Sequence, residues 1–179
     1  MRDEYVVVLD FLSRGHADSR RAEPIAQGIG STFLSLLEVV LKPDVTVKPG
    51  DLLYIGEMKR DKVKYIKGRI RYNALTSFAK DELEDVIDKI IDNNEKRFVN
   101  FFNTAGPIST RLHSLELLPG IGKKHMWSII GQRKKKKFES FEDLKTMVEM
   151  LPDPKRMIKK RIIEELEEKD RHRLFVVLR

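Results

Sequence analysis

The sequence predicts an α+β protein with a small N-terminal β-barrel followed by an all-α unit. Three observations support this fold class. Runs of β-branched and aromatic residues, some alternating with polar ones, fill residues 5–75. From residue 79 the apolar residues recur at helical spacing. A glycine-rich turn at 120–122 then separates two segments with the pattern of short helices. The expected boundaries are 1–75 for the barrel, 76–106 for a connecting amphipathic helix, 107–168 for the helical unit and 169–179 for a C-terminal strand.

Four segments are predicted to be strands of the barrel, because each is rich in residues that favour extended backbone. A polar loop at 13–27 and a turn at Gly28–Gly30 are expected between the first two. Four or five strands in about 70 residues are typical of a small barrel of the oligonucleotide-binding type. The predicted strands are Tyr5–Leu12, Phe33–Leu41, Leu52–Ile55 and Val63–Tyr72.

The last of these strands is expected to carry a basic face. Alternation places Ile66, Ile70 and Tyr72 on one side and polar residues on the other. Such a face suits nucleic acid, because cations hold phosphates and an aromatic ring stacks on bases. An ordinary solvated strand face is the open alternative. The residues of the expected basic face are Tyr65, Lys67, Arg69 and Arg71.

The connecting helix is expected to begin after Ser77 as its N-cap, with Asp81 and Glu82 in its first turn. Its outer side is strongly acidic. A metal site is one interpretation of that acidity. We favour a solvated helix face, since exposed helix faces are normally charged. The acidic residues are Asp81, Glu84, Asp85, Asp88, Asp92 and Glu95.

The most informative stretch is the turn Leu118-Pro119-Gly120-Ile121-Gly122. Its glycines permit conformations and close approaches that other residues do not. The N–H groups that open the next helix have no helical acceptor and form a natural phosphate site. Lys123 and Lys124 add positive charge there. The flanking helices are expected from Pro107, with Ile108, Leu112 and Leu115 inward, and over Lys123–Arg133, with Met126, Ile129 and Ile130 inward.

This stretch resembles the helix-hairpin-helix element of Holliday-junction-binding subunits, bacterial DNA ligases and competence DNA receptors. The resemblance runs from about Leu112 to Arg133. It implies phosphate contacts from Gly120, Gly122, Lys123 and Lys124, without base reading. It also implies a monovalent cation, K⁺ or Na⁺, held by the backbone carbonyls of Glu116, Leu118 and Ile121. A tight turn between packed helices is the alternative.

A second helix pair is expected to follow the first one in the chain. Ser140 and Asp143 form an approximate capping box, and Asp153 is a suitable N-cap before Pro154. The whole unit therefore resembles a tandem helix-hairpin-helix domain with a degenerate second copy. We expect no phosphate contact at that second turn, because Asp153 repels phosphate. The segment Leu174–Leu178 is expected to form a strand that pairs back near Tyr5–Leu9.

Composition favours a polyanionic partner. The net charge is +7 and the pI is near 9.5. Residues 111–161 alone hold fourteen basic and six acidic residues, so the positive charge is concentrated in the helical unit. The chain has no cysteine, no apolar run long enough to cross a membrane and no visible signal peptide, so we expect a cytoplasmic protein. A basic run follows the hairpin directly and consists of Arg133, Lys134, Lys135, Lys136 and Lys137.

No pattern of catalytic residues stands out. The four histidines lack metal-ligand spacing, and the sequence contains no phosphate-binding Walker loop. Trp127 is expected to pack against Phe138 or Phe141, with base stacking as the alternative. We therefore expect a binding protein rather than an enzyme, without a cofactor other than the cation at the hairpin.

The whole chain also resembles a family of uncharacterised archaeal proteins to which RNA binding is ascribed. The resemblance rests on Asp10-Phe11-Leu12, Leu36-Leu37-Glu38, Gly50-Asp51 with Tyr54-Ile55-Gly56, and the 118–133 segment. It implies sequence-independent nucleic-acid binding, with RNA favoured over DNA. The alternatives are a DNA repair or recombination accessory protein, and an assembly factor for an acidic protein or ribosomal surface.

Overall fold

The computed structural model describes residues 3–17 and 22–177. They form two compact units, which are taken in turn. Unit 1 is drawn from residues 1–86 and 164–179, and unit 2 from 87–163. The expected loop at 13–27 and the expected C-terminal strand each include residues outside the described part.

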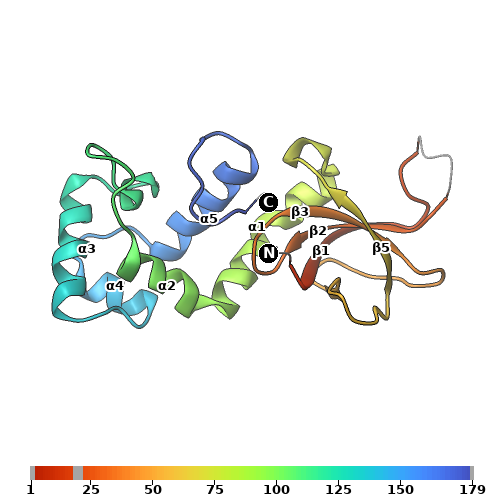
Figure 1. The fold of residues 1–179 in the computed structure, drawn as a ribbon, viewed down its shortest axis with the longest axis horizontal. Coiled ribbons are helices and arrows are strands. Elements are labelled where there is room, and N and C mark those ends of the chain that lie inside the picture. Colours follow the sequence, from red (N-terminus) through yellow and green to blue (C-terminus); the bar gives the residue numbers. More distant parts are fainter. Residues whose placement is uncertain (1–2, 18–21, 178–179) are drawn as a thin grey trace. The chain divides into compact units, whose positions relative to one another are not determined.

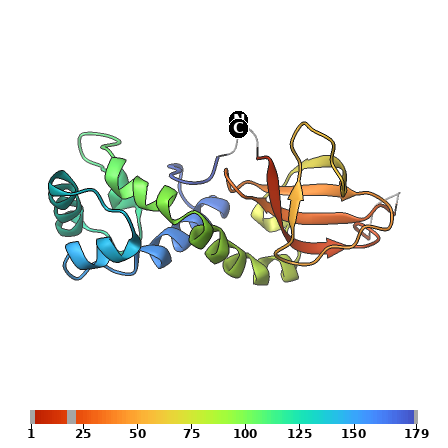
Figure 2. The ribbon, with the colours of Figure 1, turned by 90° about the horizontal axis from the view of Figure 1, so that it is seen from below.

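Unit 1 contains a curled five-stranded antiparallel sheet that forms a half-barrel (Figures 1 and 2, red to yellow). The strand order is β4-β1-β2-β3-β5. The α+β class agrees with the sequence prediction, and five strands fall within the expected four or five, but β2 was not among the four segments predicted to be strands. The strands are β1 (Tyr5–Leu12), β2 (Ile25–Gly30), β3 (Leu36–Leu41), β4 (Leu52–Tyr54) and β5 (Val63–Arg69).

Strand β2 corrects the expectation of a turn at 28–30. Both glycines lie within a fully buried strand between β1 and β3. A Cβ atom at Gly28 would collide with the side chain of Val6, and one at Gly30 would collide with the carboxylate of Asp3. Glycine is therefore required here by close packing, and not by a turn.

The hydrophobic core of the half-barrel explains which strand residues are apolar. Alternate residues of β1 and β3, one residue from each of the other three strands, and residues of the loops at either end of β4 pack into one buried cluster. The cluster consists of Val6, Val8, Ala26, Leu37, Val39, Leu41, Val47, Leu53, Ile55 and Val63.

Helix α1 (Ser77–Asn93) begins one residue earlier than expected, because Thr76 and not Ser77 caps it. The Thr76 hydroxyl oxygen accepts the N–H of Ala79 at 3.0 Å and its hydroxyl donates to Asp10 of β1 at 2.6 Å. The Gln27 side chain accepts the Thr76 N–H and donates to the carbonyl of Ala74. These bonds attach the start of α1 to the sheet.

The predicted single connecting helix is in fact two helices. It breaks at Asn94, whose side chain donates to the carbonyl of Ile90 at 2.8 Å, and helix α2 (Glu95–Thr104) follows. Two of the acidic residues of α1, Asp88 and Asp92, pair with lysines of helix α5 (Pro154–Leu166). They are therefore ion-pair partners and not simply a solvated face.

The α-helix expected from Pro107 is absent. Pro107 instead bridges to His113 as an isolated β-pair, and only a 3₁₀-helix, η2 (Ser114–Leu117), precedes the glycine turn. His113 and Glu116 form the capping box of η2. This cap fixes the start at residue 114 and excludes a helix through it.

Three helices complete unit 2 after the turn: α3 (Lys123–Lys135), α4 (Phe141–Met147) and α5. The predicted caps of the last two are confirmed. Ser140 accepts the N–H of Asp143 at 3.1 Å, and Asp153 accepts that of Arg156 at 3.2 Å.

The described residues of the expected C-terminal strand, 174–177, form no strand. The buried Glu165 carboxylate accepts the backbone N–H groups of Leu174, Phe175 and Val176 at 2.7, 3.0 and 2.9 Å. One further bond within unit 1 follows, from the Val177 N–H to the carbonyl of Phe33 at 2.9 Å. A side chain thus replaces the strand partner that was expected near Tyr5–Leu9. Among the helices of the described residues, none is both long and apolar enough to span a membrane.

Candidate nucleic-acid interface

The glycine turn of unit 2 is tightly closed. The N–H of Ile121 donates to the carbonyl of Leu118 at 3.1 Å. Gly120 has a φ of +89°, and a Cβ there would lie 3.3 Å from Pro152. Gly120 is therefore needed by the fold itself, because side chains disfavour that φ.

Gly122 differs from Gly120 in a way that concerns ligands. Its φ of −100° is open to any residue, and a Cβ would have no neighbour within 4 Å. Packing in the described residues therefore does not require glycine at this position. It is the N-cap of α3, whose first helical bond runs from the Met126 N–H to its carbonyl. The first N–H groups of this turn have no acceptor within the helix, and Gly122 beside them has no side chain to cover them.

The two predicted lysines of this helix start are not equivalent. Lys123 is paired with the Glu116 carboxylate at 3.0 Å, whereas Lys124 is exposed and forms no ion pair within the described residues. The bond from Lys123, with the N–H of His113, lowers the pKa of Glu116. Lys124 is thus the cation more available to a ligand.

Arg133, predicted to contact nucleic acid, has a structural partner instead. Its guanidinium donates to the carbonyls of Phe102 and Ala105 at 3.0 and 2.8 Å, where α2 ends. Cations at such an end satisfy orphan carbonyls and complement the helix dipole. We therefore assign Arg133 to holding α2 against α3.

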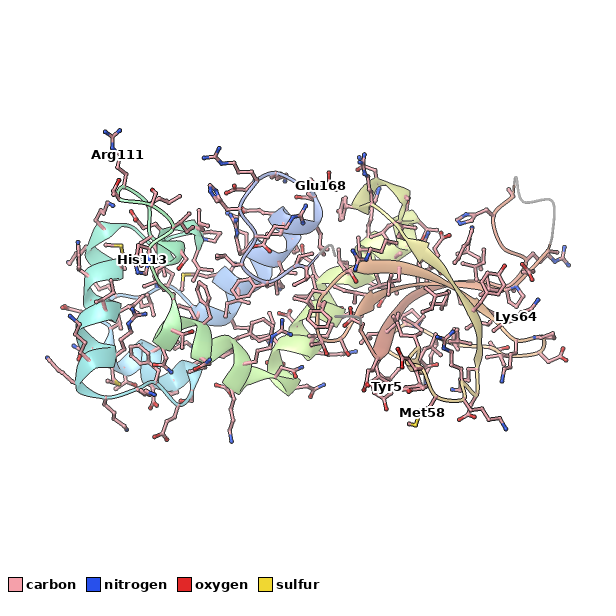
Figure 3. All side chains as sticks on the ribbon, viewed as in Figure 1. Tyr5, Met58, Lys64, Arg111, His113 and Glu168 are labelled. Carbon is pink, nitrogen blue, oxygen red and sulfur yellow. The ribbon has the colours of Figure 1, made fainter. Side chains whose placement is uncertain are left out.

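The basic run after Arg133 is held at both ends. Asn103 donates to the carbonyl of Phe138 at 2.8 Å and accepts its N–H at 2.9 Å. Between Arg133 and Phe138, the four residues of 134–137 are exposed and form no ion pairs in the part of the chain that is described. The segment 134–137, which is fixed on both sides by the hydrogen bonds of Arg133 and Phe138, therefore presents four lysines without a carboxylate partner among the described residues. At the other end of the unit, Arg111 points away from the helices in the loop before η2 (Figure 3).

The predicted basic face of β5 is divided by a bulge. Gly68 pairs with Glu38 and Ile66 with Val39, so Lys67 is an extra residue in the strand. The bulge reverses the alternation, and Arg69 lies opposite Leu37. The expectation that all four residues share one face is therefore wrong.

Three of those four side chains also contact carboxylates. Tyr65 donates to Glu23 at 2.8 Å, a bond that raises the pKa of its phenol. Lys67 pairs with Glu38 at 3.0 Å, and Arg71 lies 3.9 Å from Glu168. This surface is therefore largely neutralised in the free protein.

Glu38 is the centre of a buried polar cluster. Burial opposes ionisation of its carboxyl, but hydrogen bonds from Gln27, Lys67 and His16 outweigh it and lower its pKa. The bonds from Gln27 and His16 are 2.9 and 2.6 Å long. The cluster ties the loop before β2 to the middle of the sheet.

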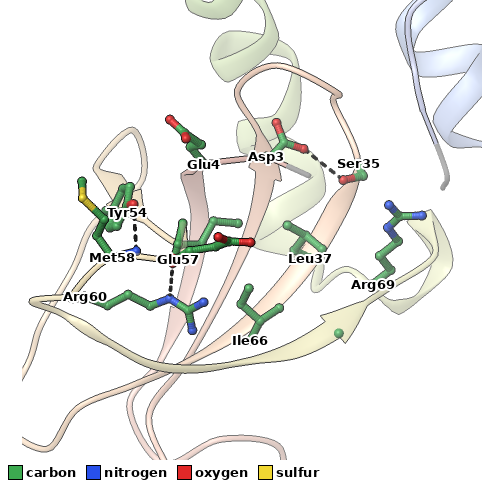
Figure 4. A pocket seen from close by; sticks show the side chains of 13 residues that line it. Asp3, Glu4, Ser35, Leu37, Tyr54, Glu57, Met58, Arg60, Ile66 and Arg69 are labelled. Atoms are coloured by element: carbon green, nitrogen blue, oxygen red, sulfur yellow. Dashed lines mark hydrogen bonds between the residues drawn. The ribbon is translucent and has the colours of Figure 1, made fainter. Parts of the chain in front are cut away.

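A pocket of about 1090 Å³ lies in the half-barrel, and Arg69 is one of the residues that line it (Figure 4). Leu37, Ile55 and Ile66 provide apolar surface in it. Asp3 is engaged in structure, since it accepts the N–H groups of Thr32 and Phe33 and the Ser35 hydroxyl. The charged lining does not favour a polyanion, because three carboxylates offset two guanidinium groups. These are Asp3, Glu4, Glu57, Arg60 and Arg69.

The second turn offers little to a phosphate. Asp153 occupies the N-cap of α5. Lys155 pairs with Asp92 at 2.7 Å, and Lys159 pairs with Asp88 at 2.9 Å. These two lysines of α5 are therefore already neutralised.

A search of the described residues finds no group of three or more acidic, histidine or cysteine side chains able to hold a metal ion. The cation expected at the carbonyls of Glu116, Leu118 and Ile121 stays a prediction. The Leu118 carbonyl already accepts one N–H, which leaves it one lone pair for such an ion.

Comparison with known proteins defines the family. A family model described as a protein of unknown function, DUF655, matches residues 2–177. The chain belongs to this family. An uncharacterised protein of Methanocaldococcus jannaschii, MJ0038, is 46% identical over 176 residues, which cover 97% of this chain and 80% of that protein.

A solved structure extends the likeness to the fold. The crystal structure of Af1531 from Archaeoglobus fulgidus, described by the same DUF655 family model, matches with a TM-score of 0.88 and 45% identity. The match covers 98% of this chain and 100% of that one. The resemblance to an uncharacterised archaeal family is thereby confirmed. The names of these DUF655 relatives specify no ligand or activity.

Sequence reasoning missed two features of the candidate interface. Trp127 was expected to pack against Phe138 or Phe141, with base stacking as the alternative, but it is 65% exposed on α3. Its position three residues after Lys124 on a helix was a usable signal. The anchoring of Arg133 on α2 was not readable from the sequence, since its partners are backbone carbonyls some thirty residues away.

Proposed function

We propose that this protein binds nucleic acid without catalysing a reaction, and that the grip is the start of α3 with the lysines of 134–137. The observation that carries the proposal is Gly122, where nothing within 4 Å explains the absence of a side chain. Phosphate oxygens need that close approach to backbone N–H groups. Binding of this kind depends on salt and is largely independent of sequence.

The finer fold interpretation belongs to the same proposal. We interpret 112–133 as a helix-hairpin-helix element whose first helix is reduced to η2, with a degenerate second copy around Asp153. The half-barrel is interpreted as a relative of the oligonucleotide-binding barrel. RNA is placed before DNA on the resemblance drawn from the sequence alone; the family model itself is described as a protein of unknown function. The geometry of the hairpin favours neither polymer.

A fluorescence-anisotropy titration tests the proposal. Labelled RNA and DNA of equal length, single- and double-stranded, are titrated at several salt concentrations. Salt-dependent binding is expected, and Gly122→Val should weaken it about tenfold or more, because a branched side chain keeps phosphate from the N–H groups. Gly106→Val is the matched control, since Gly106 also lacks neighbours within 4 Å but lies outside the turn.

Charge reversal gives a second, independent variant. Lys124→Glu should weaken binding strongly, whereas Lys89→Glu changes the net charge equally on an exposed site of α1 and should not. Thermal unfolding verifies that each variant is folded. Absence of binding to every probe at low salt would overturn the proposal and favour an acidic protein partner. Tight binding to DNA but not RNA would replace the RNA preference by the repair alternative.

A further inference from the structure

Trp127 is an unexplained residue of unit 2. It is the only tryptophan of the chain, and it is 65% exposed in the middle of α3. Single exposed hydrophobic residues are common on proteins, so exposure alone means little. The neighbours of this indole on the helix give it a specific chemistry.

The exposed face of α3 carries lysines on both sides of the indole. Lys124 lies three residues before Trp127, Gly131 four after and Lys134 seven after, and all are exposed. A Cβ at Gly131 would have no neighbour within 4 Å, so the surface beside the indole is open. From Lys124 to Lys134 the helix rises about 15 Å. That length is comparable with four stacked nucleotides at about 3.4 Å each.

This combination fits a base better than it fits a lipid or an apolar protein surface. A helix face that inserts into a membrane or a protein groove presents several apolar residues. Among the described residues, Trp127 is the single exposed apolar side chain of α3. A flat indole between lysines instead provides a stacking surface with cations for the adjoining phosphates.

We infer that Trp127 stacks on an unpaired nucleotide, so that the preferred ligand has a single-stranded segment beside the backbone held at Gly122 and Lys124. This inference rests on the proposed function and deepens it. Bases inside a duplex are covered on both faces by their neighbours, so only an unpaired or terminal base can reach the indole. Intact blunt duplex is then held by the phosphate grip alone.

The sole tryptophan makes the test direct, because its fluorescence reports this site only. The full-length protein is titrated with a single strand, a blunt duplex and a duplex with a short overhang, while anisotropy of a label on the nucleic acid measures affinity. We expect the single strand and the overhang to quench Trp127 and the blunt duplex to bind with little quenching. Trp127→Ala should lose about tenfold or more in affinity for the single strand and almost nothing for the blunt duplex.

Two further variants separate stacking from mere apolarity. Trp127→Tyr should retain most of the affinity because its ring still stacks, whereas Trp127→Leu should behave like Trp127→Ala. The inference would be overturned if Trp127→Ala bound every probe as tightly as the wild type and no probe quenched the Trp127 fluorescence of the wild type. Such a result would leave the proposed hairpin grip intact. A change in Trp127 emission with anionic phospholipid vesicles, but not with any oligonucleotide, would also overturn it. Failure of the proposed function is distinguished by Gly122→Val, which would then leave all affinities unchanged.

Discussion

At the scale of single residues, His113 is expected to make the stability of the segment before the glycine turn depend on pH. Its Nδ1 accepts the N–H of Leu115 at 3.1 Å, so the imidazole is neutral in the folded protein. Burial and then the charge of Arg133 lower its pKa below the ordinary 6.5. As the pH falls below 6.5, His113 therefore binds a proton more readily in the unfolded chain than in the folded one. Its contribution is complete above that pH and is lost on acidification.

The variant His113→Asn tests this account by urea unfolding between about pH 7.5 and pH 5.5. Asparagine is a good N-cap and does not titrate, so the variant should match the wild type at the upper pH and lose less stability at the lower one. His113→Ala should instead lose about 1 kcal/mol at both. An unchanged pH profile in His113→Asn would refute the assignment.

At the scale of elements, Arg133 is predicted to matter for stability. Its bonds to the carbonyls of Phe102 and Ala105 join the ends of α2 and α3. Arg133→Met leaves these carbonyls without a donor and should reduce the free energy of unfolding by about 2 kcal/mol. Lys134→Met, one residue later on the exposed face, should change it by less than about 0.5 kcal/mol. Equal losses of unfolding free energy for the two variants in urea titrations would mean that the hydrogen bonds of Arg133 do not stabilise the fold.

Glu165 is predicted to secure the end of the chain by a similar logic. Its carboxylate accepts three consecutive backbone N–H groups, from Leu174 to Val176, without a strand partner. In Glu165→Gln, the NH₂ group of the amide faces a backbone N–H donor that the carboxylate would otherwise accept. The free energy of unfolding should therefore fall by about 3 kcal/mol. Amide hydrogen exchange of 174–176 should accelerate selectively. Glu164→Gln on the same helix is the control, and equal acceleration there would contradict the role of Glu165.

At the scale of the whole molecule, several features set by nearby residues were predictable, although the caps at Thr76 and His113 were missed, and features set by distant residues were not. The caps at Ser140 and Asp153 depend on residues within one turn, and both were predicted correctly. The bulge at Lys67 depends on the register of β3, and the glycines of β2 depend on Val6 and Asp3. For the same reason the glycine turn was visible as a candidate site, while the neutralisation of the β5 face was not.

The distribution of ion pairs over the molecule yields a last prediction about salt. Lys134 and Lys135 have no carboxylate partner in the described part of the chain, whereas Lys155 and Lys159 are paired with Asp92 and Asp88. Replacing either pair by glutamine removes the same charge. Only the first replacement should reduce the slope of log Kd against log salt, by about 0.7 to 0.9 for each phosphate that the protein no longer neutralises.

The second replacement leaves Asp88 and Asp92 unpaired, so it should lower the midpoint of unfolding and leave that slope unchanged. The measurement is the affinity for one single-stranded probe at several salt concentrations, with thermal unfolding of each variant alongside. Equal slopes for the two variants would show that total charge, rather than the braced lysines beside α3, governs binding. Unequal slopes in the expected order would locate phosphate contacts at the end of α3, because net charge and ligand are the same in both experiments.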